Sequence, residues 1–157
     1  MIGSTMPLII IHTEIKAKIN TCFDLARNID FHQESLEHSN ENAIDGKTSG
    51  LIELGESVTW EATHFGIKQR LTSKITEFSS PDYFVDEMVS GAFKSFRHEH
   101  FFELQNNYTV MIDKFYFESP FGIFGKIANI LFLERYMTAL LSKRNELLKL
   151  QAENSVL

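Results

Sequence analysis

Two histidines and two aspartates are the residues of this sequence whose chemistry is most distinctive. His98 and His100 are two positions apart, so on a β-strand both imidazoles project from the same face. Asp86 and Asp113 could supply a carboxylate to each imidazole. Such pairs are suited to proton transfer, to metal binding by two histidines and one carboxylate, or to recognition of a ligand's polar group. The spacing alone is a weak signal for a metal. We therefore predict no metal and no cofactor, and favour ligand recognition over catalysis.

Turn positions predict that neighbouring strands bring these groups together. A two-residue turn at 106–107 and a tight turn at 91–93 would each place an imidazole directly opposite a carboxylate: His100 opposite Asp113, and His98 opposite Asp86. The same kind of register places opposite charges across the other face of the sheet, pairing Glu61 with Arg70, Lys74 with Glu87, and Glu99 with Lys114. Such cross-strand pairs are favourable, so the registers support one another.

The face that carries the four polar groups is otherwise apolar. The chain has 14 Phe but only 4 Tyr and 1 Trp, and such rings either fill a solid core or line a cavity. Four titratable groups would be costly in a solid core, which favours the cavity. We predict that the ligand contacts Asp86, His98, His100, Asp113, Trp60, His64, Phe96, Phe102, Met111, Phe115 and Met137. We also expect Trp60, Phe96, Phe102, Met111, Phe115 and Met137 to be buried, and Lys68, Arg70, Lys74, Glu99 and Lys114 to be exposed.

The elements that must position these residues follow from the hydrophobic pattern. Alternation of polar and apolar residues predicts strands at 8–15, 56–65, 67–78, 83–89, 94–105 and 108–118. Helical spacing predicts short helices at 17–27 and 30–36 and a long one at 125–150, whereas 38–50 is polar and predicts a loop. One face of the long helix carries Ile130, Leu133, Met137, Leu140, Leu141, Arg144 and Leu148.

The order of these elements is typical of an α+β fold. We expect an antiparallel sheet with the long C-terminal helix across one face and two short helices after the first strand. No change in composition marks a linker, so we predict a single domain over residues 1–157, with residues 1–6 as a loose tail. The apolar, glycine-containing segment 119–125 is either a packed turn or a lid that could also touch a membrane transiently.

Composition excludes several classes of protein. Lys and Arg number 15 and Asp and Glu number 21, giving a net charge of −6, so a nucleic-acid partner is not expected. No apolar run approaches the roughly 20 residues of a membrane-spanning helix, and no basic segment precedes an apolar one at the N-terminus. The single Cys22 cannot form an internal disulfide. These features predict a cytoplasmic protein.

Several stretches of the sequence resemble a known superfamily. They are GESVTW at 55–60, HFG at 64–66, DEMVSG at 86–91, FKSFRHEHFF at 93–102 and DKFYFESPFG at 113–122. Together with the element order over 8–150, they resemble the SRPBCC superfamily, whose helix-grip fold is shared by START domains and birch-pollen-allergen-like (Bet v 1-like) proteins. Within it, the sequence is similar to a bacterial group labelled polyketide-cyclase/dehydrase-like or cell-division-inhibitor-like.

The resemblance implies a curved seven-stranded sheet that grips the long helix around a hydrophobic cavity. It also implies a small hydrophobic partner, such as a lipid, a sterol or a polyketide. Two functions follow: a module that binds the ligand without changing it, and a cyclase or dehydratase that uses the Asp–His pairs for proton transfer. The cell-division label suggests a regulatory protein but assigns no residue.

Overall fold

The computed structural model describes residues 6–119 and 132–155. The described elements are β1 (Leu8–Ile15), α1 (Ile19–Ala26), α2 (Ile29–Ser35), a short 3₁₀ turn (Glu37–Ser39), β2 (Asn42–Gly46), β3 (Ser57–His64), β4 (Ile67–Ser79), β5 (Tyr83–Ser90), β6 (Ser95–Gln105), β7 (Tyr108–Glu118) and α4 (Glu134–Asn154). None of the described helices combines the length and the apolar character that a membrane-spanning segment needs.

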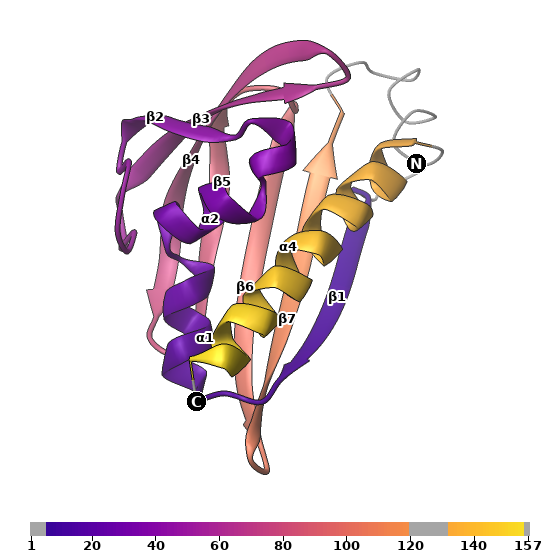
Figure 1. Ribbon diagram of the computed structural model, residues 1–157. Helices are drawn as coiled ribbons and strands as arrows, with labels where there is room; N and C mark the ends of the chain where they lie inside the picture. Colours follow the sequence, from indigo (N-terminus) through magenta and orange to yellow (C-terminus); the bar gives the residue numbers. More distant parts are fainter. Residues whose placement is uncertain (1–5, 120–131, 156–157) are drawn as a thin grey trace, which may run out of the picture.

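Within the described residues the strands form one antiparallel sheet of seven strands, in the order β1-β7-β6-β5-β4-β3-β2. Figure 1 shows this sheet curving around α4, with α1 and α2 covering the remainder of the same face. The arrangement is the helix-grip fold expected from the element order. Since the helices lie on one face, that face collects the buried side chains and the other meets solvent.

The predicted registers are confirmed. Glu61 pairs with Arg70, Lys74 with Glu87, Glu99 with Lys114, His100 with Asp113 and Asp86 with His98. Strand β6 shows the cause, because its buried and half-buried residues alternate along most of its length. A shift of one position would move every inward-facing side chain to the solvent face.

The predicted loop at 38–50 is wrong in part, because Asn42–Gly46 forms β2. This strand pairs with β3 at the edge of the sheet, and most of its residues are exposed. An edge strand that buries neither face needs no apolar alternation. The sequence pattern therefore gave no sign of it.

The long helix ends later than predicted, and parts of three predicted segments lie outside the described residues. Helix α4 begins at Glu134 in the described residues and continues past the predicted end at 150 to Asn154. The stretch 125–131 of the predicted helix lies outside the described residues. So do residues 120–125 of the predicted turn or lid and residues 1–5 of the predicted tail.

Most of the burial predictions are confirmed, with three corrections. Trp60, Phe96, Phe102, Met111 and Phe115 are buried, and Lys68, Arg70 and Lys74 are exposed. Met137 is only half-buried, since it borders a cavity. Glu99 and Lys114 are half-buried instead of exposed: the Arg97 guanidinium covers Glu99 at 2.9 Å, and the Lys114 ammonium lies 5.2 Å from the centre of the Phe101 ring.

Candidate ligand-binding cavity

A cavity of about 490 Å³ lies between the sheet and helices α2 and α4. Its walls are mainly apolar, and its volume falls within the range of roughly 300–1,000 Å³ that is usual for small-molecule sites. The predicted ligand-contacting residues that line it are Trp60, His64, Asp86, Phe96, His98, His100, Phe115 and Met137.

Three predicted contact residues do not line this cavity. Phe102 and Met111 pack with Phe23 of α1 in a hydrophobic cluster at the other end of the sheet. Asp113 is 1% exposed and lies behind the imidazoles instead of beside the cavity. The registers place all three on the inner face, but the sheet is longer than the cavity. Only part of its inner face is available to a ligand.

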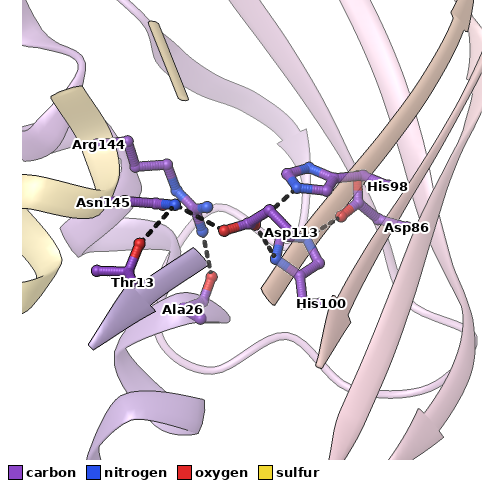
Figure 2. A network of polar contacts seen from close by, with 8 residues as sticks. All are labelled: Thr13, Ala26, Asp86, His98, His100, Asp113, Arg144 and Asn145. Carbon is purple, nitrogen blue, oxygen red and sulfur yellow. Dashed lines mark hydrogen bonds and ion pairs between the residues drawn. The ribbon is translucent and has the colours of Figure 1, made fainter. Parts of the chain in front are cut away.

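The two acid–imidazole hydrogen bonds are diagonal to the strand register. Nε2 of His98 bonds to Oδ1 of Asp113 at 2.8 Å, and Nε2 of His100 bonds to Oδ2 of Asp86 at 2.9 Å (Figure 2). Each imidazole thus reaches the carboxylate that lies diagonally from it. His100 Nδ1 is also 3.1 Å from Asp113 Oδ1, an ion-pair distance without the direction of a hydrogen bond.

Aromatic rings and an amide hold this cluster in place. The His98 and His100 rings stack with centroids 3.8 Å apart, Phe84 stacks on the outer side of His100 at 4.2 Å, and Phe115 meets His98 edge-on. Behind them, Asn145 of α4 donates to Asp113 Oδ2 at 2.6 Å. The imidazoles are therefore fixed on both sides before any ligand arrives.

The surroundings give the two histidines different proton affinities. Burial lowers the pKa of His98, and the neighbouring His100 lowers it further. Burial also opposes the charge on His100, but Asp113 and Asp86 outweigh it and raise the pKa of His100. Burial would raise the pKa of both carboxyls, yet their bonds to the imidazoles bring the pKa of Asp86 below its usual range and that of Asp113 well below it. The cluster therefore favours two carboxylates, an imidazolium at His100 and a neutral His98.

Asp86, His98 and His100 are also the described residues that come nearest to a metal site. Their ligand atoms lie within 4.8 Å of one another, as in a set of two histidines and one carboxylate. In the structure Nε2 of each histidine is instead hydrogen-bonded to a carboxylate. The absence of a metal from the functional protein stays a prediction.

A second polar group lines the cavity near β3. His32 Nε2 bonds to Glu41 Oε1 at 2.7 Å, and the His32 ring packs on Trp60. His64 bonds to the hydroxyl of Tyr136 on α4. Of these residues, sequence reasoning found only His64 and Trp60, because Glu41 belongs to the polar segment that was predicted to be a loop.

Arg144 is a further cavity residue that sequence reasoning missed. It is 3% exposed, and its Nη2 donates to the carbonyl oxygen of Ala26 at 2.7 Å, at the end of α1 (Figure 2). Its Nε and Nη1 have no hydrogen-bond partner among the described residues. The sequence did contain one sign of its role: Arg144 lies on the apolar face of the long helix, between Leu141 and Leu148.

Comparisons with known proteins connect this architecture to solved structures. No protein-family model matches the chain, and no curated protein matches it in sequence. Protein TTHA0849 from Thermus thermophilus is similar in structure, with a TM-score of 0.71 at 17% identity over 90% of this chain and 97% of its own. Ginseng major latex-like protein 151 from Panax ginseng gives 0.69 at 13% identity, over 95% and 99% of the two chains. The protein Ara h 8.0201 gives 0.65 at 6% identity, over 91% and 97%.

These likenesses cover nearly the whole length of each partner, at identities that establish the fold and no more. The chain therefore has the helix-grip fold, which it shares with these solved proteins.

Proposed function

We propose that the protein binds one small apolar molecule in the cavity between the sheet and α4. The observation that carries the proposal is an apolar cavity of about 490 Å³ into which a few fixed polar groups converge. The apolar part of the ligand lies against Phe96, Phe115 and Met137. Its polar part contacts Asp86, His98 and His100.

Native mass spectrometry of the purified protein is the first test, because a tightly held ligand is retained through purification. A second test uses N-phenylnaphthylamine, a neutral dye that fluoresces in apolar sites. We expect one molecule of dye to bind per chain and the retained ligand to displace it. If the dye does not bind the ligand-free protein, the cavity is not a binding site and the proposal fails.

The diagonal bonds decide which double variant tests the polar contacts. Asp86→Leu with His100→Phe removes both members of one hydrogen-bonded pair and keeps the His98–Asp113 pair. We expect it to weaken binding of the retained ligand by about 2–5 kcal/mol, the usual range for loss of a buried charged contact. The matched control is Glu87→Leu with Arg97→Leu, an ion pair from the same two strands on the opposite face. Equal affinities in the two double variants would contradict the proposed polar contacts.

One observation favours proton transfer as a second candidate function. His98 lines the cavity, and since its Nε2 faces Asp113, its neutral form leaves Nδ1 free to accept a proton. This is the arrangement of a carboxylate-oriented general base, as a cyclase or dehydratase would need. Conversion of the retained molecule by the wild type, lost in His98→Gln with ligand binding intact, would establish it.

A further inference from the structure

Arg144 is a buried charge that has no counter-ion within the part of the chain that the structure describes. A guanidinium carries five N–H donors, and the only acceptor that the described residues offer them is the Ala26 carbonyl oxygen. The end of α1 offers a partial negative charge at that point, which compensates the arginine in part. A buried cation whose remaining donors are unpaired is costly, so the site favours an acceptor from outside the chain.

The two acids that line the cavity near Arg144 are already engaged. The Asp86 carboxylate accepts from His100 at 2.9 Å, and the Glu41 carboxylate accepts from His32 at 2.7 Å. The charge of Arg144 acts on both acids, but neither forms an ion pair with it among the described contacts. The positive charge of Arg144 is therefore left for a ligand.

The surroundings of Arg144 define the ligand further. On the same side of α4, Met137, Leu140 and Leu141 line the cavity, so an apolar chain or ring could extend from the guanidinium along the helix. Figure 2 shows Arg144 approaching from the α4 side, with the imidazoles of β6 across from it. Arg144 carries one positive charge, and the carboxylates of Asp86 and Glu41 lie near it. The site therefore favours a ligand group with one negative charge over a group with two.

We propose that Arg144 binds the carboxylate of an apolar carboxylic acid, which makes such acids the ligand class of the cavity. The inference rests on the proposed binding function and adds the charge and the chemical group. A planar carboxylate suits the guanidinium, which can donate two parallel hydrogen bonds to it. Nδ1 of His98, whose Nε2 is bonded to Asp113, then remains available to another polar atom of the ligand.

Displacement of N-phenylnaphthylamine tests the inference with four probes that share one apolar chain. These are dodecanoate, dodecanol, dodecyl phosphate and dodecyltrimethylammonium. In the wild type we expect dodecanoate to bind on the order of a hundredfold more tightly than dodecanol, which corresponds to one buried charged contact. Arg144→Met should lose that preference while still binding dodecanol. Lys143→Met removes the same charge from an exposed position next to it and should keep the preference.

The outcomes separate this inference from the function on which it rests. If the dye fails to bind, the cavity proposal itself fails. If the dye and dodecanol bind but dodecanoate has no advantage, the cavity is confirmed as a site and the role of Arg144 is overturned. Equal losses of dodecanoate and dodecanol in Arg144→Met would show that Arg144 only supports α1. Tighter binding of dodecyl phosphate or of the ammonium probe would overturn the carboxylate assignment.

Discussion

At the scale of single residues, His98 and His100 are stacked neighbours that favour opposite protonation states. His100 contacts two carboxylates, whereas His98 has one carboxylate partner and faces the charge of His100. Two protonated rings at 3.8 Å would repel each other, so protonation of one disfavours protonation of the other. The pair therefore combines one charged ring and one neutral ring within one cavity wall.

The titration of these rings is the first prediction. The pKa of His100 is raised, so its contribution to stability is full below about pH 6.5 and is lost as the pH rises through its folded value. The pKa of His98 is lowered, so its contribution is present above about pH 6.5 and is lost as the pH falls. These windows lie on opposite sides of about pH 6.5, so the two rings together contribute a maximum in the free energy of unfolding near that pH. NMR titration of the ring protons resolves them, and we expect His100 to titrate above His98.

Variants assign the cause of this separation. Asp86→Asn removes the charge of one partner of His100 and should move its titration to lower pH. Asp45→Asn changes an exposed carboxylate on β2 and should move neither histidine. Coincident midpoints for the two rings in the wild type would contradict the assignment of charge.

Sequence reasoning found part of the candidate site for a clear physical reason. The period of two in a strand placed His98, His100, Asp86 and Asp113 on one face, and two turns set which of them lie opposite. It could not show that the hydrogen bonds run diagonally, because that depends on side-chain torsions and on the stacking against Phe84. It also gave Arg144 no role, since nothing in a helical pattern shows which polar atoms lack partners.

At the scale of elements, two glycines with similar backbone torsions face different surroundings. Gly46 at the end of β2 has φ +73°, and a Cβ there would lie 2.3 Å from the Ser57 carbonyl oxygen. Gly55 has φ +81°, with no atom of the described residues within 4 Å of such a Cβ. Both positions disfavour a side chain, but only Gly46 is also blocked by the neighbouring strand.

The second prediction compares alanine at these two positions. Gly55→Ala should cost about 1 kcal/mol, because an L-residue is strained in the left-handed region. Gly46→Ala should cost about 1–3 kcal/mol more, since β2 must also move away from β3. Urea unfolding followed by circular dichroism measures both values. Equal losses would show that β2 shifts freely at the sheet edge.

The element predictions succeeded where one face of an element is buried. Strands β3 and β6 alternate clearly because every second side chain meets the helices or the cavity. Strand β2 could not be found in this way, because most of its residues are exposed and its pairing with β3 contains an irregularity. Alternation of polar and apolar residues arises when one face of a strand is buried, so a strand that buries neither face shows no such alternation.

At the scale of the whole molecule, the inner face of the sheet has a solid end and a hollow end. Around α1, the Phe23 ring is 1% exposed and contacts Phe78, Phe84 and Phe102 edge-on. Toward the start of α4, Phe96 and Phe115 instead border the cavity. Phenylalanine side chains therefore both fill a solid core and line a cavity, the two alternatives that composition alone could not separate.

The third prediction compares Phe102→Ala with Phe96→Ala. Both side chains are buried on the same face of β6, but Phe96 lines the cavity between the sheet and α4 and Phe102 does not. Phe102→Ala opens a new cavity and should cost about 3–5 kcal/mol in the free energy of unfolding. Phe96→Ala should cost less and should admit bulkier ligands, because it enlarges a space that is already present. Urea unfolding measures the difference, and a larger loss for Phe96→Ala would contradict this division of the molecule.

The strand order also has a consequence for the time at which the protein can fold. Strand β1 begins at Leu8 and pairs with β7, which ends at Glu118, so β1 must wait for its partner until β7 has been synthesised. Until then its apolar residues, Ile9 and Ile15 among them, have neither the strand nor α4 to cover them. Pairing over so long a stretch of chain is intrinsically slow and leaves the nascent chain prone to aggregation. A ligand that requires the closed cavity can therefore bind only after α4 has been synthesised.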